Sequence, residues 1–335
     1  SVVVSRLFGA EDRGGVKCAV TTAFISSMVL GIILTLFGYF FNHQMMRWIR
    51  TPQNIMADGV LYLKIYIFGI IFLMLYNVCT GVFTALGDSK TPLHFLLGSS
   101  AGNIILDYIF VAKFHWGVSG VAWATFIAQG VSAVLALVTL LGRLQKFAGK
   151  EKQPWFDKKL FAQIMAIAIP SILQQSVLSV GNLFVQGIVN QFGSAVYSKT
   201  INLNTFAINI FMTLGSCLSS YTAQNIGAGK KERIPLGFRT GLKLSELTAL
   251  PFVILYFVFS RQMMGLFLGA ESVEAISAGM AFLKIVSPWY FMIVIKLMTD
   301  GIIRGSGAMV YFVVATVPDL ILRIGFALVL TKSFG

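Results

Sequence analysis

The feature that most constrains the fold is a succession of nine apolar stretches, each long enough to cross a lipid bilayer. A transmembrane helix needs about 20 predominantly apolar residues. The stretches cover residues 17–41, 59–86, 91–112, 116–142, 160–190, 200–224, 236–260, 276–303 and 309–331. Of the 335 residues, 56% are hydrophobic and only 12% are charged, which is far from the usual composition of a soluble protein. Because backbone groups in hydrocarbon must bond within their own segment, we expect an all-α polytopic membrane protein with the lipid bilayer as its partner.

The net charge of +13 is distributed unevenly between the connecting loops. With the first connecting segment on the cytoplasmic side, sixteen Lys and Arg residues fall in loops on that side and six in loops on the other. The positive-inside rule therefore predicts a multi-pass plasma-membrane protein whose long basic loop, within residues 142–159, is cytoplasmic. The basic charge is then a topology signal, and we expect no nucleic-acid partner.

Short motifs recur at a nearly constant distance along the chain. Gly9-Ala10 returns 218 residues later as Gly227-Ala228, and the segment 62–65 returns 220 residues later as 282–285. Such a repeat indicates a duplicated lobe, as in many transporters. We therefore expect an N-terminal lobe, a cytoplasmic linker and a C-terminal lobe, which occupy residues 1–145, 146–159 and 160–335.

The same offset predicts how many helices each lobe contains. When the sequences of the two lobes are aligned at this offset, the N-terminal lobe lacks its first two helices and the C-terminal lobe lacks its last helix. About nine spans are then present of twelve, and we expect two homologous six-helix lobes in the intact protein.

Asp107 lies well inside the apolar stretch 91–112, with Asn103 one helical turn before it. Side chains four residues apart share a helix face, so the carboxylate and the amide point to the same place. Oxygen ligands of this kind suit a hard cation, and a buried carboxylate also suits a proton. The alternative is a hydrogen-bonding cluster that only holds helices together. The sequence leaves both interpretations open.

The C-terminal half carries two further pairs of opposite charge, Lys296 with Asp300 and Asp319 with Arg323. Each pair has i, i+4 spacing, which predicts local ion pairs with a structural role, and a position in a transport cavity is the alternative. No Ser/His/Asp or Cys/His constellation stands out in the sequence. We therefore expect no enzymatic activity, no cofactor, and no bound metal other than a sodium ion at Asn103 and Asp107.

Several segments together have a recognisable order and spacing. They are Ala85–Pro92 with the sequence ALGDSKTP, Asn103 with Asp107, the segments 115–120 and 122–125, Pro170 with Gln174-Gln175, and Asn225–Ala228. In these motifs the chain resembles multidrug and toxic compound extrusion (MATE) transporters of the bacterial type, and the resemblance covers essentially the whole chain.

The resemblance implies a secondary active multidrug exporter of the cell inner membrane. By alternating access it would antiport small cationic or amphiphilic compounds against Na⁺ or H⁺, as a monomer with drug-like small-molecule substrates. The resemblance also implies that Thr125 joins Asn103 and Asp107 in the coupling site, with another Asp on the missing first helix. A lipid-linked oligosaccharide flippase of the same superfamily is the alternative function, and it would favour a strongly cationic central cavity.

Overall fold

A computed structural model describes all residues except 49–50, 52, 148–153, 190–193, 269–272 and 335. The described residues form helices joined by short turns, and no strand occurs among them. The chain divides into two compact units, Val3–Ile164 and Met165–Gly335. The expected all-α class is confirmed.

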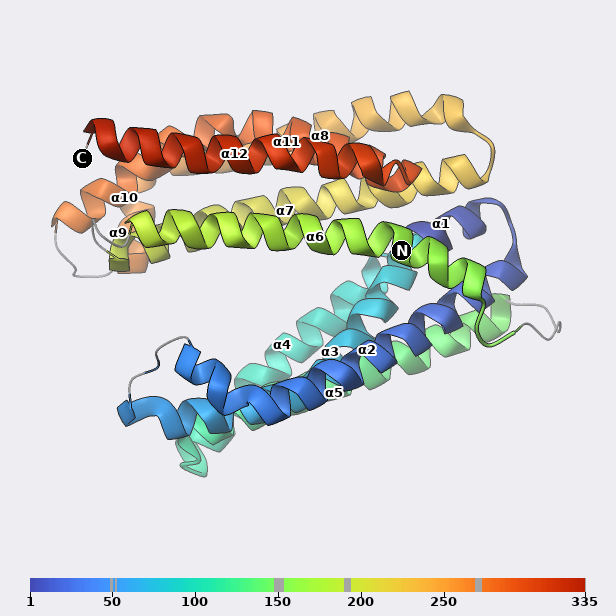
Figure 1. Cartoon of the computed structure of the whole chain (residues 1–335), viewed down its shortest axis with the longest axis horizontal. Coiled ribbons are helices and arrows are strands. Elements are labelled where there is room, and N and C mark those ends of the chain that lie inside the picture. The colour runs from blue at the N-terminus through green and yellow to red at the C-terminus, as the bar shows by residue number, and fades with distance from the viewer. Residues whose placement is uncertain (49–50, 52, 148–153, 190–193, 269–272, 335) are drawn as a thin grey trace. The chain divides into compact units, whose positions relative to one another are not determined.

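The first unit is a bundle of long helices (Figure 1). Its elements are α1 (Val2–Gly9), α2 (Arg13–Trp48), α3 (Gln53–Ala85), α4 (Lys90–Tyr108), a π-helical turn (Ile109–Lys113), α5 (Gly117–Phe147) and the beginning of α6 (Lys158–Val189). Helix α3 packs against both α2 and α5, and α4 packs against α5. Helices α3, α4 and α5 therefore form the part of the bundle that carries the predicted coupling residues.

The second unit is built around α7, α8 and α11, which run alongside one another (Figure 1). It contains the remainder of α6, α7 (Ser194–Gly227), α8 (Ile234–Val258), α9 (Ser260–Leu268), α10 (Val273–Val286), α11 (Tyr290–Ser306) and α12 (Met309–Phe334), with 3-10 turns at Lys231–Arg233 and Ser287–Trp289. Its core contains the fully buried side chains of Phe211, Tyr256 and Tyr290. The Tyr256 hydroxyl donates to the Leu203 carbonyl at 2.9 Å, which satisfies its polar end.

Eight helical segments of the described chain are long and apolar enough to cross a membrane. They coincide with eight of the nine predicted stretches, from the first, within Arg13–Trp48, to the eighth, within Ile276–Ser306. The ninth stretch, 309–331, falls in α12, a helix of 26 residues in which several side chains lie outside the described set. Many large apolar side chains of these helices are exposed, as expected of a surface that contacts lipid.

The turns that end the helices repeat with the sequence offset. Glu11 follows α1 with φ 59° and Gly229 follows α7 with φ 71°, while Gly87 follows α3 with φ 81° and Gly307 follows α11 with φ 78°. In the two turns of each pair, N–H groups at equivalent positions donate to carbonyl groups at equivalent positions. The hydrogen-bond pattern is that of a helix C-terminus. Two pairs of turns with matching geometry, at offsets of 218 and 220 residues, support the duplication of the lobe.

Candidate functional site

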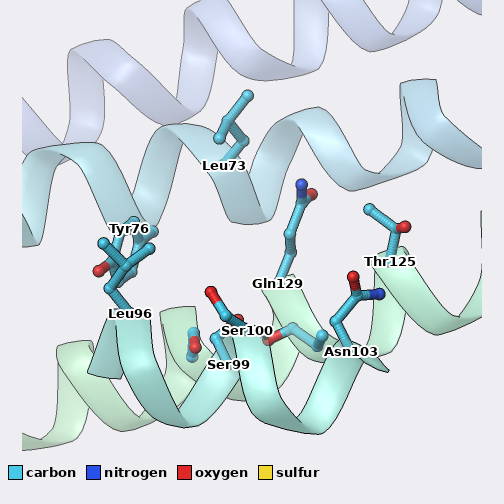
Figure 2. A pocket seen from close by; sticks show the side chains of 10 residues that line it. Leu73, Tyr76, Leu96, Ser99, Ser100, Asn103, Thr125 and Gln129 are labelled. Carbon is cyan, nitrogen blue, oxygen red and sulfur yellow. Dashed lines mark hydrogen bonds between the residues drawn. The ribbon is translucent and has the colours of Figure 1, made fainter. Parts of the chain in front are cut away.

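A cavity of about 230 Å³ lies between α3, α4 and α5 in the first unit (Figure 2). Most of its lining residues have a polar side chain, and none carries a formal charge. The lining residues are Leu73 and Tyr76 from α3, Leu96, Ser99, Ser100 and Asn103 from α4, and Thr125, Ala128, Gln129 and Ser132 from α5. Two of the three predicted coupling residues, Asn103 and Thr125, therefore face the same space from neighbouring helices.

The third predicted residue, Asp107, lies one turn beyond Asn103 on α4 and is not part of the cavity lining. Its Oδ1 atom is buried and has no hydrogen-bond partner among the described residues, and the same holds for Nδ2 of Asn103. A buried polar atom without a partner costs about 1–3 kcal/mol, and more when the group is charged. Oδ1 of Asp107 therefore lacks a donor or a cation, whereas Nδ2 of Asn103 lacks an acceptor.

Thr125 already uses its hydroxyl proton within its own helix. Its Oγ1 donates to the Val121 carbonyl at 3.0 Å, so that only the oxygen lone pairs remain available to the cavity. An oxygen whose proton is engaged in this way is a suitable cation ligand.

Two other hydroxyl groups join α4 to α5. Ser99 Oγ donates to the Ala128 carbonyl at 3.2 Å, and Ser132 Oγ donates to the Phe95 carbonyl at 3.3 Å. Hydrogen bonds of this kind contribute roughly 0.6 kcal/mol each between membrane helices. Ser99 and Ser132, which sequence reasoning did not single out, therefore link the two helices.

The ends of α4 and α5 on the other side of the cavity are held by an ion pair. Asp88 accepts hydrogen bonds from the Lys90 and Thr91 N–H groups, both at 3.1 Å, and from the Thr91 hydroxyl at 2.6 Å. The Arg143 guanidinium pairs with Asp88, donates to Thr91 Oγ1 at 3.1 Å and lies over the Phe83 ring at 5.4 Å. Burial alone would raise the pKa of Asp88, but the hydrogen bonds from Thr91 and Lys90 and the charge of Arg143 outweigh it, and the pKa is lowered.

Four charged residues of the second unit with described side chains lie on α11 and α12. Lys296 Nζ lies 3.8 Å from Oδ2 of Asp300 and 3.8 Å from Oδ2 of Asp319, so one ammonium group bridges two helices. Asp300 is buried, and the Arg304 guanidinium, one turn further along α11, lies over the Phe312 ring at 5.0 Å. The predicted partner of Asp319, Arg323, has a side chain outside the described residues. The bridge from Lys296 to Asp319 crosses between helices, and i, i+4 spacing did not reveal it.

No group of three His, Cys, Asp or Glu side chains that could hold a metal ion occurs in the described part of the chain. Any cation at Asp107 would therefore take its other ligands from amide, hydroxyl and carbonyl oxygens and from water.

Comparison with known proteins adds an independent line of evidence. A family model described as MatE matches residues 1–109 and 166–329. The probable multidrug resistance protein YpnP of Bacillus subtilis is 27% identical over 338 residues, which cover 99% of this chain and 75% of the relative. The probable multidrug resistance protein NorM of Thermotoga maritima is 23% identical, over 100% of this chain and 73% of the relative.

Solved structures show the same fold. A MOP superfamily transporter from Pyrococcus furiosus superimposes with a TM-score of 0.92 at 20% identity, over 99% of this chain and 75% of that one. An outward-facing multidrug resistance MATE family transporter gives a TM-score of 0.91, also at 20% identity, with the same coverage of both chains.

Proposed function

The chain belongs to the MatE family of multidrug transporters, and on this premise we propose that it is a secondary active exporter that antiports small cationic or amphiphilic compounds against Na⁺ or H⁺. In this proposal an ion bound at Asp107, Asn103 and Thr125 drives export by alternating access. The protein acts as a monomer in the plasma membrane, with the basic loop at residues 146–159 on the cytoplasmic side.

The observation that carries this proposal is the buried Oδ1 of Asp107, which has no hydrogen-bond partner among the described residues. A charge in the membrane interior costs from about 2.5 to more than 10 kcal/mol, so a carboxylate there gains strongly from a proton or a cation. The hydroxyls of Ser99 and Ser132 already link α4 to α5, which removes the main reason to assign Asp107 and Asn103 a purely structural role.

Binding at this site couples to transport through a difference in affinity. An ion that binds one conformation of the transporter more tightly shifts the population towards it, and an ion that binds both equally shifts nothing. We propose that the occupied Asp107 stabilises one of the two access states and that release of the ion stabilises the other.

The charges in the second unit favour drug antiport over the flippase alternative. A flippase for an anionic lipid-linked sugar would benefit from free cations, whereas Lys296 lies 3.8 Å from the carboxylates of both Asp300 and Asp319. Lys296, Asp300, Asp319 and Arg304 together carry two positive and two negative formal charges, and we assign them a structural role.

Dye efflux from proteoliposomes tests the function directly. We expect the full-length protein to export an amphiphilic cationic dye when a sodium or a proton gradient is imposed, and we expect Asp107→Asn to reduce this export by about tenfold or more, because it removes the charged ligand. The Asp58→Asn variant, at an exposed position on α3, serves as the control and keeps the wild-type rate. Ion dependence that is unchanged in a folded Asp107→Asn variant would contradict the assignment.

A further inference from the structure

A further cavity of the first unit, of about 310 Å³, lies between α4 and α5. It shares Ser99, Ala128 and Ser132 with the α3–α4–α5 cavity, but none of its lining residues belongs to α3. Val131 and Leu135 in its lining are 55% and 50% exposed, so the cavity is a groove on the surface of the helix bundle. We call it the α4–α5 groove, and its lining includes His94, Gly98, Gly102 and Leu106 from α4 and Val131 and Leu135 from α5.

Two glycines on α4 leave space in this groove. Gly98 and Gly102 are four residues apart and share a helix face. A Cβ atom added at either glycine would meet no other atom within 4 Å. The hydroxyls of Ser99 and Ser132 already donate to backbone carbonyls of the neighbouring helix, at 3.2 and 3.3 Å. The groove therefore offers few free donors and suits a hydrocarbon better than a polar ligand.

The groove has the length of one membrane leaflet and a basic end. His94 and Leu106 are twelve residues apart, which corresponds to about 18 Å along a helix, and half of a 30 Å hydrocarbon core is about 15 Å. Lys90, the exposed first residue of α4, lies four residues before His94 on the same face. The positive-inside rule places this end of α4 on the cytoplasmic side. The groove thus extends from a basic end at the cytoplasmic boundary towards the middle of the bilayer.

The second lobe indicates that this face of the helix pair contacts lipid. By the offset of 220, Gly102 and Leu106 correspond to Leu322 and Phe326 on α12. The second unit contains α7 and most of α6, which are the first two helices of its lobe, and Leu322 and Phe326 are still 56% and 60% exposed. We therefore expect the corresponding two helices of the first lobe to leave the groove uncovered.

We propose that the α4–α5 groove binds one acyl chain of an anionic phospholipid of the cytoplasmic leaflet, whose phosphate contacts Lys90 and His94. Basic pockets between membrane helices on this side bind anionic lipid headgroups. A helix of a second copy fits less well, because helices that pair through glycines need close backbone approach. The exposed side chains of Val131 and Leu135 beside the glycines oppose such an approach, whereas a flexible chain can enter between them.

The test measures lipid binding to the purified full-length protein. Delipidated protein is titrated with phosphatidylglycerol or with phosphatidylethanolamine, and native mass spectrometry gives the affinity for the first bound lipid. We expect Gly98→Leu and Gly102→Leu, which fill the groove, to weaken the binding of both lipids about tenfold, because the chain loses buried methylene groups. We expect Lys90→Gln to weaken the binding of phosphatidylglycerol about fivefold and to leave that of phosphatidylethanolamine nearly unchanged.

The matched control is Gly325→Leu, at an exposed position on α12 where an added Cβ also meets no atom within 4 Å. It should keep both affinities. Unchanged binding in Gly98→Leu and Gly102→Leu overturns the inference, and so does an equal loss in Gly325→Leu. A dimer that Gly98→Leu dissociates would identify a second copy as the occupant and would also overturn it. An equal effect of Lys90→Gln on both lipids would refute the headgroup assignment, and the proposed ion site at Asp107 is independent of all these outcomes.

Discussion

At the scale of single residues, the carboxylates at the two ends of α4 differ in their hydrogen bonding. Asp88, before the helix, accepts three hydrogen bonds and an ion pair, whereas Oδ1 of Asp107, near its end, has no hydrogen-bond partner among the described residues. Both are carboxylates in or beside the same apolar stretch. The difference supports a structural role for Asp88 and our proposal that Asp107 binds the ion.

Asp88 supports a prediction about acid stability. Its pKa is lowered below the ordinary value of 3.8, so its charged form stabilises the folded protein at pH values above that, and this contribution is lost as pH falls through the lowered pKa. Asn at this position keeps the capping oxygen but loses the charge. We therefore expect Asp88→Asn to lower the melting temperature in detergent at neutral pH, and the difference from the wild type to disappear as the wild-type carboxylate becomes protonated.

A second variant separates the ion pair from the helix cap. Asp88→Ala removes both, and loss of a cap costs about 0.5–2 kcal/mol, so its melting temperature should lie below that of Asp88→Asn. A constant difference between wild type and Asp88→Asn down to the lowest pH would show that the charge of Asp88 does not stabilise the fold.

At the scale of helices, the closest packing in the second unit is between α7 and α11. A Cβ atom added at Gly301 would overlap the Gly215 carbonyl oxygen, and one added at Gly305 would overlap the Ser219 carbonyl oxygen. Small residues let membrane helices approach until their backbones touch, which gains dispersion energy where the hydrophobic effect between helices is absent. The glycines on α11 therefore set the distance between these two helices.

This packing predicts the effect of one methyl group. Gly301→Ala should destabilise the protein by about 1–3 kcal/mol, because the backbone of Gly215 cannot move aside as a flexible side chain can. Gly241→Ala on α8 is the matched control, since its Cβ would lie 3.6 Å from the Leu218 side chain in ordinary contact. Thermal unfolding in detergent measures both variants, and equal melting temperatures would refute the assigned role of Gly301.

The sequence predicts features that are local to one helix, but not the contacts between side chains of different helices. The spans were predictable because lipid imposes one requirement, a long apolar segment, on every helix that crosses it. The spacing of Asn103 and Asp107 was readable because it is local to one helix, and Gln129, four residues after Thr125, carried the same signal. The Asp88–Arg143 and Lys296–Asp319 pairs join different helices, and no periodicity within a helix indicates which partner it will meet.

At the scale of the whole molecule, the two lobes have diverged from a common plan. The continuous helix α3 corresponds by the offset of 220 to α10, the 3-10 turn at Ser287–Trp289 and α11, and Pro288 occupies that turn where the first lobe has Phe68. Proline removes a backbone donor and interrupts a helix. The carboxylate of Asp88 has no counterpart either, because Ala308 stands at the equivalent position. The duplicated lobes share their turns and the lysines at positions 64 and 284, but the carboxylate of Asp88 belongs to the first lobe alone.

The orientation of the whole molecule follows from its charge and is open to a direct test. Lys230 and Arg261 are exposed residues just outside the two ends of α8, and the excess of cations predicts that Lys230 is cytoplasmic and Arg261 external. Cys18 and Cys79 are buried and Cys217 is exposed, so a Cys217→Ala background leaves an introduced cysteine as the accessible thiol among the described residues. In that background a membrane-impermeant maleimide should label Arg261→Cys in intact cells and Lys230→Cys only in inverted vesicles. The reverse pattern would invert the topology and place the long basic loop outside the cell, against the positive-inside rule on which the assignment rests.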